Sequence, residues 1–568
     1  MRGRAVEDTT VVVLGAGING AALARELLLS GVHVVLVDAG DIACGATAWS
    51  TRLVHGGLRY LEYGEIGLVR ESLAERDRLV RLAPHLVQPL PFYLPVRSRG
   101  GGLAAAVARL AGLESLARRW RGRGRGALAV GIGLTLYDAL AVGAGWPRHR
   151  SVAAGRPDLP PVDPIAFPRG AVYVDAQMVF PERFTVELCV DARRIAAAQG
   201  TSFRLRNHAT AVRCDGDVLR IEGGGGDAID VRPAALVNAT GAWVDHTLAE
   251  LLPGRSGPLI GGTKGSHLVL ALPALRAALG DHGVYAEAED GRPVFVLPFG
   301  PSLVLVGTTD IPFTGDPAAA RADEDEIAYL LAAVSRLFPD LAPDCGSVLQ
   351  HYAGVRPLPT HGGGVPAAVT RRHMLVRHPQ APFPAWSIVG GKLTTCRSLA
   401  EQAARDVLGA VGVPVRGTSA ERPLPGSLAA EVRGACVAEA AVQMRAAGVP
   451  PDVGERAAAR AVDLFGARGV EVCRRMARLP AGVPPLVSGT DLPTSAVEFA
   501  VEREWAASLA DLVERRLMLS FAERLPVAAL DAVAAELARL CMLAPERVAA
   551  EVQACTDHLR RAYGKRVA

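Results

Sequence analysis

The chain has 568 residues, half of them apolar, and a formal net charge of only +4. This length exceeds what one hydrophobic core accommodates, so we expect several domains, and the near-neutral charge argues against a dedicated nucleic-acid binder. The nine cysteines form no CxxC pair, which favours a reducing compartment over a disulfide framework or a metal site. No run reaches the ~20 apolar residues of a spanning helix, and the first residues lack a signal-peptide core. We therefore expect a cytoplasmic protein, at most attached peripherally to the inner face of the cell membrane.

The N-terminal region has the pattern of a dinucleotide-binding unit. An apolar strand leads into Gly15, Gly17 and Gly20, at the start of a helix that we expect over residues 19–30. Gly15 suits a tight turn, Gly17 a close approach of the backbone to a pyrophosphate, and Gly20 close packing of the helix on the strand. The phosphates then lie at the positive end of the helix. A second strand ends at Asp38, where a carboxylate can accept hydrogen bonds from ribose hydroxyls.

Strand and helix signals alternate along the rest of the first 410 residues. We expect helices over 65–83, 179–200 and 323–338 and from 395 through 407, and strands over 266–270, 294–297 and 303–308. After Gly412 the strand signals stop, and residues 417–568 are expected to form a helical domain. Within it, Ser495 and Glu498 predict a capping box at the start of a helix that continues to about residue 519.

Seven further motifs follow in order: Thr47-Ala-Trp-Ser-Thr-Arg-Leu-Val-His-Gly-Gly-Leu-Arg-Tyr-Leu-Glu62, Asn238-Ala-Thr-Gly-Ala-Trp243, Lys264-Gly-Ser-His267, Gly307-Thr-Thr-Asp310, Gly354-Val-Arg-Pro-Leu358, Thr370-Arg371 and Gly390-Gly-Lys-Leu-Thr-Thr-Cys-Arg397. Together they resemble the FAD-dependent glycerol-3-phosphate dehydrogenases over residues 8–410, and the tail resembles that family's C-terminal domain. This chain departs from the family's pattern at several positions. Trp49 interrupts a serine-rich run, Arg52 replaces a usual lysine, and Cys396 stands where tyrosine is common. The run Val179-Phe-Pro-Glu-Arg183 keeps its arginine but lacks the paired acids that usually precede it.

The resemblance implies an α/β fold with a Rossmann-like FAD-binding domain of the glutathione-reductase and D-amino-acid-oxidase type. An antiparallel substrate sheet and a C-terminal all-α domain accompany it. The expected oxidoreductase unit covers residues 1–410, and the helical domain covers 417–568. Within the unit, the FAD-binding domain takes about 8–90, 170–257 and 345–410, and the substrate domain takes about 91–169 and 258–344.

The resemblance also implies a reaction. Members oxidise sn-glycerol 3-phosphate to dihydroxyacetone phosphate by hydride transfer from C2 to non-covalent FAD. Electrons then pass to ubiquinone or menaquinone. Three alternatives stay open on the sequence. One is a glycerol-3-phosphate oxidase that uses O2, and another is an amine-oxidising relative of the same fold whose arginines bind a carboxylate. The third is a non-enzymatic FAD-binding regulator. The oligomeric state is also open, a homodimer included.

Matching the motifs residue by residue gives an expected cofactor site and an expected substrate site. The expected FAD contacts are Gly15, Gly17, Gly20, Asp38, Thr47, Ser50, Thr51, His55, Gly56, Gly57, Thr240, Gly241, Trp243, Gly390, Gly391, Lys392, Leu393 and Thr394. A phosphorylated substrate needs fixed cations, for which arginine forks are suited. The expected substrate contacts are Arg59, Tyr60, Arg356, Arg371, Thr308 and Thr309.

The same match suggests the catalytic groups. Lys392, one of three lysines in the chain, is expected beside the flavin and the substrate, together with Arg356. Alcohol oxidation needs a base for the hydroxyl proton, and a histidine suits neutral pH. His267 is the favoured candidate and His55 the second. An alkoxide stabilised by arginine, with no dedicated histidine, stays open.

A basic stretch between Arg97 and Arg125 contains eight arginines and one acid. Apolar residues repeat at helical spacing from Leu103 to Trp120, which is typical of an amphipathic helix at a membrane surface. A surface helix packed on its own domain is the alternative.

Overall fold

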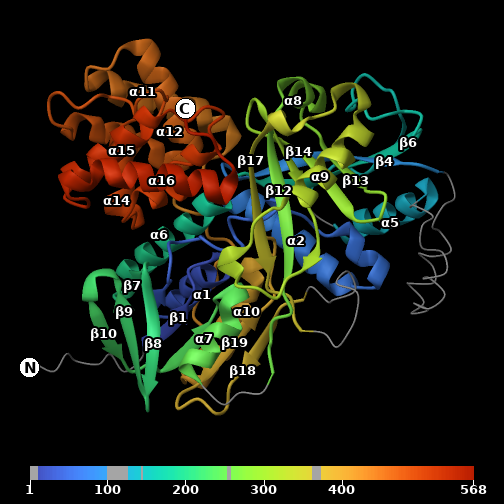
Figure 1. Cartoon of the computed structure of the whole chain (residues 1–568). Helices are drawn as coiled ribbons and strands as arrows, with labels where there is room; N and C mark the ends of the chain where they lie inside the picture. Colours follow the sequence, from blue (N-terminus) through green and yellow to red (C-terminus); the bar gives the residue numbers. More distant parts are fainter. Residues whose placement is uncertain (1–9, 99–125, 142–144, 253–256, 361–371) are drawn as a thin grey trace, which may run out of the picture.

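The computed structural model describes residues 10–98, 126–141, 145–252, 257–360 and 372–568. These residues form two large sheets, a small three-stranded sheet and a group of C-terminal helices. In Figure 1 the C-terminal helices, coloured orange and red, gather at one end of the molecule, next to α6 and β17.

The first large sheet has six strands in the order β18-β19-β11-β1-β2-β7. Only β18 runs antiparallel to its neighbour among these strands. The side chains of Val11 and Val13 pack on one face, and those of Val12 and Leu14 on the other. Both faces are therefore buried, which explains the uninterrupted apolar run. The strands are Met374–Arg377, Ala385–Val389, Ala235–Asn238, Thr10–Leu14, His33–Val37 and Phe203–Arg206.

Helices cover one face of this sheet, namely α1 (Ile18–Leu29), α6 (Pro181–Gln199) and α10 (Cys396–Ala410). The predicted helices in these places are confirmed with small shifts at their ends. The other face carries α7 (Val244–Leu251) and the small sheet of β8 (Ala209–Asp215), β9 (Val218–Gly223) and β10 (Ala228–Val231). The carboxyl ends of β1 and β2 are thus left for a ligand, as in other open parallel sheets.

The second large sheet has ten strands in the order β16-β12-β15-β14-β13-β4-β6-β3, with β17 paired to β12 and β5 paired to β6. Its pairings are antiparallel except that of β13 with β4. The strands are Ile311–Pro312, Thr263–Ala271, Leu303–Gly307, Pro293–Phe299, Gly283–Glu287, Val87–Val96, Arg169–Met178, Leu53–Val54, Val348–Arg356 and Arg150–Ala153.

Three of these strands come from segments expected in the FAD-binding domain, namely β3, β6 and β17. They join the second sheet because the chain crosses between the two sheets at these points. Helices α8 (Pro273–Leu279) and α9 (Glu324–Leu337) pack on one face of the second sheet. Helices α2 (Ile66–Leu82) and α5 (Ala127–Leu140) pack on the other. Helices predicted over 65–83 and 323–338 are confirmed as α2 and α9.

Residues 417–568 are all described, and their α-helices share one apolar core. These helices are α11 (Ala430–Ala446), α12 (Pro451–Phe465), α13 (Gly469–Arg474), α14 (Ser495–Glu504), α15 (Val527–Arg539) and α16 (Val548–Tyr563). Helix α14 contacts α6, and α16 contacts β17. The helical region therefore packs against both large sheets or the helices on them.

The predicted capping box and long helix after residue 494 are wrong. The Ser495 hydroxyl donates to a carbonyl of α13, and the Glu498 carboxylate pairs with two arginines. Helix α14 ends at Glu504 because Trp505 adopts a left-handed conformation with φ 56°. The chain then enters a separate π-helical segment, Asp511–Arg516.

The amphipathic stretch from Leu103 to Trp120 lies outside the described residues. None of the helices that are described is long and apolar enough to span a bilayer.

Candidate active site

The glycine loop after β1 is tight because its glycines contact other backbone atoms. Gly15 has φ 99°, and a Cβ there would lie 2.6 Å from the Ala239 carbonyl oxygen. A Cβ on Gly20 would lie 1.9 Å from the Gly15 carbonyl oxygen. Gly17 precedes the first residue of α1, and the Ile18 amide donates to the Thr47 hydroxyl over 3.1 Å. The loop therefore depends on glycine at Gly15 and Gly20, whatever ligand it holds.

Asp38 follows the last residue of β2, and its carboxylate faces the glycine loop. It accepts from the Ala16 amide at 2.6 Å and from the Gly40 amide at 2.9 Å. Burial raises the pKa of Asp38, while the two amides oppose that rise by stabilising the charged form. The carboxylate is thus held in place at the mouth of the loop, where a ribose hydroxyl would meet it.

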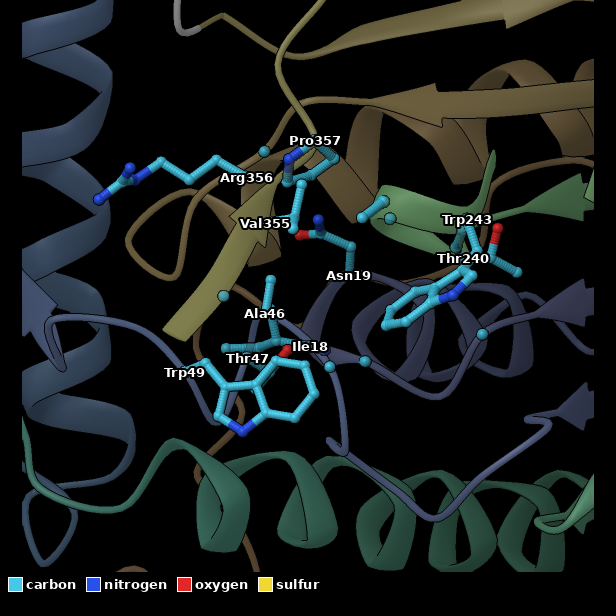
Figure 2. Close-up of a pocket in the computed structure, with 18 of the residues that line it drawn as sticks. Ile18, Asn19, Ala46, Thr47, Trp49, Thr240, Trp243, Val355, Arg356 and Pro357 are labelled. Carbon is cyan, nitrogen blue, oxygen red and sulfur yellow. Dashed lines mark hydrogen bonds between the residues drawn. The ribbon is translucent and has the colours of Figure 1, made fainter. Parts of the chain in front are cut away.

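A cavity of about 670 Å³ runs from Asp38 across the glycine loop to the segment after β19. Figure 2 shows part of its wall, including Asn19, Thr47, Trp49, Trp243 and Arg356. Of the expected FAD contacts, the following line it: Gly15, Gly17, Asp38, Thr47, Ser50, Thr51, His55, Thr240, Gly241, Trp243, Gly390, Gly391, Lys392, Leu393 and Thr394. The sequence motifs that are far apart in the chain therefore converge on one elongated cavity.

The lining of this cavity fits an extended dinucleotide such as FAD. The Asn19 Oδ1 atom is buried and accepts no hydrogen bond from the described residues. Gly241 has φ 62° and open space where a Cβ would lie. Gly390 and Gly391 also have positive φ, of 80° and 100°. A buried acceptor beside backbone without side chains suits a ligand that brings its own polar groups close to the chain.

A second cavity of about 160 Å³ adjoins the first, and Thr51, Leu53, His55, Tyr60 and Arg356 line both. Its remaining lining includes the basic residues Arg59 and Arg292, the acidic residues Glu65, Asp175 and Asp310, and the hydroxyl residue Thr308. Aromatic side chains of the second sheet complete its wall: Phe92, Tyr173, Tyr285 and Phe295. We call this the side cavity. It is a small compartment, walled by charged and aromatic side chains, that adjoins the cofactor cavity.

Arg356 lies at the end of β17, where the two cavities meet. Its Nη1 donates to Asp310 Oδ1 at 3.1 Å, and its Nη2 to the Thr308 hydroxyl at 2.9 Å and the Thr309 carbonyl at 3.2 Å. Three acceptors thus hold the guanidinium in place. A fork fixed in this way is suited to binding a second anion with defined geometry.

The two candidate bases have different surroundings. His267 is buried in β12, its ring stacks on Tyr352 at 4.9 Å, and its Nε2 lies 2.9 Å from the Thr51 hydroxyl. Burial, aided by the positive charges of Arg356 and Arg52, holds the pKa of His267 well below its ordinary value. His267 lines the cofactor cavity alone, whereas His55 lines both cavities. His267 is therefore a neutral imidazole in the wall of the cofactor cavity, in contact with Thr51, which lines both cavities.

Lys392 and Tyr60 form a contact between the cavities. The Lys392 Nζ lies 3.9 Å from the centre of the Tyr60 ring, within the range of a cation–π interaction. Lys392 lines the cofactor cavity and Tyr60 lines both. A single ammonium is therefore held near the entrance to the side cavity.

Some predicted residues lie away from the cofactor cavity or from both cavities. A Cβ on Gly56 would lie 2.4 Å from the Tyr137 hydroxyl oxygen, so Gly56 serves packing. Gly20 packs on Gly15, and Gly57 lines the side cavity alone.

Thr309 does not face the side cavity. It is buried, and its hydroxyl donates to Glu326 at 2.6 Å and accepts from the Ser266 amide at 2.8 Å. The expected substrate contact of Thr309 is therefore not brought to either cavity. Arg371 lies outside the described residues, so its expected role has no structural placement.

Many lining residues were not predicted, and three polar ones, Asn19, Asp310 and Arg292, show why. Asn19 lies inside the glycine loop and Asp310 ends the Gly307-Thr-Thr-Asp310 motif, so both had a sequence signal. Arg292 had none, because it lies in a turn before β14 whose place near Arg356 depends on the pairing of distant strands.

Comparisons with known proteins agree with this geometry. A family model described as FAD dependent oxidoreductase matches residues 10–379. A glycerol-3-phosphate dehydrogenase of Synechocystis is 32% identical over 90% of this chain and 88% of the relative. A D-erythritol 1-phosphate dehydrogenase of Brucella abortus is 30% identical over 91% of this chain and 96% of the relative. The solved glycerol-3-phosphate dehydrogenase from Bacillus halodurans, complexed with FAD, shares the fold with a TM-score of 0.71, at 22% identity over 98% of this chain and 95% of that chain.

Proposed function

Because this chain belongs to the FAD-dependent oxidoreductases of the glycerol-3-phosphate dehydrogenase family, we propose that it oxidises sn-glycerol 3-phosphate to dihydroxyacetone phosphate. The observation that carries the proposal is the side cavity, which adjoins the cofactor cavity beside Arg356. Arg59 and Arg292 line the same side cavity, so three arginines line a compartment of about 160 Å³. Arginine forks in a compartment of this size suit a small phosphate monoester, although Glu65, Asp175 and Asp310 line it as well.

The cofactor cavity supplies the groups that hold FAD. Asp38 lies where the ribose hydroxyls would be bound, and the glycine loop and the first turn of α1 lie where the pyrophosphate would be bound. The backbone of Gly390 and Gly391 provides close contact without side chains. When bound, FAD supplies the acceptor for the hydride that leaves substrate C2.

The substrate is held by side chains at the junction of the two cavities. Arg356, fixed by Asp310 and Thr308, presents its guanidinium to the phosphate or to the oxygen at C2. The ammonium of Lys392 adds a second positive charge beside the cofactor cavity. Positive charge placed there stabilises an alkoxide as the hydroxyl proton leaves.

A histidine accepts the proton of the C2 hydroxyl. Our favoured candidate, His267, is neutral and reaches the side cavity through the Thr51 hydroxyl, 2.9 Å from its Nε2. In this arrangement the Thr51 hydroxyl donates its proton to His267 Nε2 and receives the proton of the C2 hydroxyl. His55 is the direct alternative, since it lines both cavities. The variants His267→Gln and His55→Gln distinguish the two candidate bases. The acid limb of the pH profile of kcat should disappear in the variant that lacks the base.

Electrons leave to a membrane quinone, ubiquinone or menaquinone, at the inner face of the cell membrane. Support for membrane contact comes from α5, where Leu128 and Ile132 are each 58% exposed. Apolar side chains on an exposed helix face favour binding at a lipid interface. Co-sedimentation with anionic vesicles tests the contact, and the variant Leu128→Ser with Ile132→Ser should weaken it. Equal sedimentation of both proteins would contradict this part of the proposal.

An anaerobic titration tests the reaction. Addition of sn-glycerol 3-phosphate should bleach the flavin absorbance, and a soluble quinone should restore it faster than air does. D-erythritol 1-phosphate is included because one full-length relative carries its name. Preferential bleaching by that substrate would change the substrate but not the reaction class. Bleaching by an amino acid, with none by either polyol phosphate, would overturn the proposal in favour of amine oxidation, and fast reoxidation by air would favour an oxidase.

A further inference from the structure

The segment between β2 and β3, residues 38–52, forms a large part of the cofactor cavity wall. We call it the cofactor loop. The residues of this loop that line the cavity are Asp38, Ala39, Gly40, Cys44, Gly45, Ala46, Thr47, Trp49, Ser50, Thr51 and Arg52. The loop contains no strand and no α-helix, so its shape depends on contacts with the elements behind it.

The strongest of these contacts comes from the C-terminal helical region. Asp41 is 1% exposed and points away from the cavity. Its carboxylate accepts from Arg515 Nε at 2.6 Å and from both terminal nitrogens of Arg516 at 2.7 Å. Both arginines belong to the π-helical segment Asp511–Arg516. A buried, bidentate carboxylate–guanidinium pair has one well-defined geometry, so it fixes the loop at this point.

Two further contacts join the same parts of the chain. The His208 amide donates to the Gly40 carbonyl at 2.7 Å, and its Nε2 lies 3.0 Å from Asp511 Oδ2. At the other end of the loop, Trp49 and Tyr563 pack against the same apolar cluster, and the Tyr563 hydroxyl donates to Glu514 at 2.6 Å. Trp49 also lines the cofactor cavity (Figure 2).

Arg52 is held in the same way from the helical side. Its guanidinium lies 4.6 Å from the Phe521 ring centre and pairs with Glu182 at 2.6 Å. Trp49 and Arg52 are two of the positions where this chain departs from its family's motifs. Both therefore contact the helical region, which gives a physical reason for these residues.

We propose that the C-terminal helical region positions the cofactor loop for FAD, with Arg515, Arg516 and Tyr563 as the positioning residues. None of the three lines the cofactor cavity, so they act through Asp41 and Trp49. A loop already held in its bound shape loses less conformational freedom on binding, and the affinity rises accordingly. Linkage is reciprocal, so FAD must in turn stabilise the segment 511–516. The inference rests on FAD binding alone and not on the choice of substrate.

Amide hydrogen exchange of the full-length protein, with and without FAD, tests the reciprocal effect. FAD should slow exchange in 511–516, although this segment does not line the cavity, as well as in the glycine loop. A merely structural contact would leave exchange in 511–516 independent of FAD. Protection confined to cavity-lining segments would overturn the proposal.

Substitutions test the direct effect on the dissociation constant of FAD, measured by flavin fluorescence without substrate. Asp41→Asn should raise the constant by about 5- to 150-fold, the usual range for coupling between two sites. Tyr563→Phe removes one hydroxyl and should raise it by about fivefold. Asp463→Asn is the matched control, because it makes the same change in an exposed ion pair with Arg433 of the same helical region.

The outcomes separate the possible explanations. Weaker FAD binding in Asp41→Asn and Tyr563→Phe, with an unchanged constant in the control, supports the proposal. An unchanged FAD dissociation constant in Tyr563→Phe overturns the proposal. This test remains valid if Asp41→Asn fails to fold. A protein that binds FAD normally but ignores sn-glycerol 3-phosphate contradicts the proposed substrate and leaves this inference intact.

Discussion

Substitution of Arg356 by lysine tests whether the guanidinium fork binds the substrate. Lysine keeps the positive charge but replaces the two terminal nitrogens, bonded at 2.9–3.2 Å to Thr308, Thr309 and Asp310, by one ammonium. We expect the variant to lose at least one hydrogen bond to a charged group, which is worth about 1.5–3 kcal/mol. That loss corresponds to a fall of about 10- to 150-fold in kcat/KM. Because the Arg356 side chain is only 22% exposed and pairs with Asp310, the free energy of unfolding is measured beside the kinetics.

Steady-state kinetics at equal FAD content measure this effect, and Arg220→Lys in an exposed ion pair with Glu222 is the control. A second variant, Arg356→Gln, removes the positive charge that helps to lower the pKa of His267. The pKa of His267 then rises, so the acid limb of the kcat/KM profile should move to higher pH in the glutamine variant but not in the lysine variant. Activity of Arg356→Lys within twofold of the unsubstituted protein would refute the assignment of Arg356 to substrate.

Three other predictions concern the glycine loop, the buried histidine and the lysine. Gly20→Ala places a Cβ 1.9 Å from the Gly15 carbonyl oxygen, so we expect a loss of about 1–3 kcal/mol in stability and a low FAD content; a normal flavin spectrum and melting temperature would contradict this. The pKa of His267 in the folded protein is lowered from 6.5, so its contribution to stability is present above pH 6.5 and is lost as the pH falls. Denaturant unfolding between pH 7 and 5 should therefore show a smaller loss for His267→Gln than for the unsubstituted protein, and equal slopes would refute it. Lys392→Ala should retain FAD and lose about 100-fold or more in kcat, and unchanged turnover would remove Lys392 from the mechanism.

The sequence predicts the parts of the site whose chemistry is local. Gly15, Gly17 and Asp38 are close in sequence, and their spacing predicts a strand, a turn and a helix that the structure contains. Thr309 shows the limit of the method. It lies next to Thr308 in the same motif, but successive residues point to opposite sides of an extended chain, so only Thr308 lines the side cavity.

Features that depend on distant pairing could not be predicted from local pattern. The helix expected from Ser495 to about residue 519 is apolar at helical spacing throughout, but Trp505 interrupts it. Left-handed backbone at a tryptophan has no signature in composition. The interruption matters, because it allows a separate segment after it to present Arg515 to Asp41.

The crossing of the chain between the two large sheets explains why the substrate and cofactor residues lie together. Strands β3 and β17 belong to the second sheet, but the segments just outside them, ending at Arg52 and beginning at Pro357, line the cofactor cavity. Arg356, the last residue of β17, therefore lines both the cofactor cavity and the side cavity from a strand end. Strand pairing in the second sheet holds the residues at both crossings. The C-terminal helices also hold the cofactor loop, which leads into β3. Rigid support of this kind is what hydride transfer requires, since a displacement of about 1 Å between reacting groups costs about 100-fold in rate.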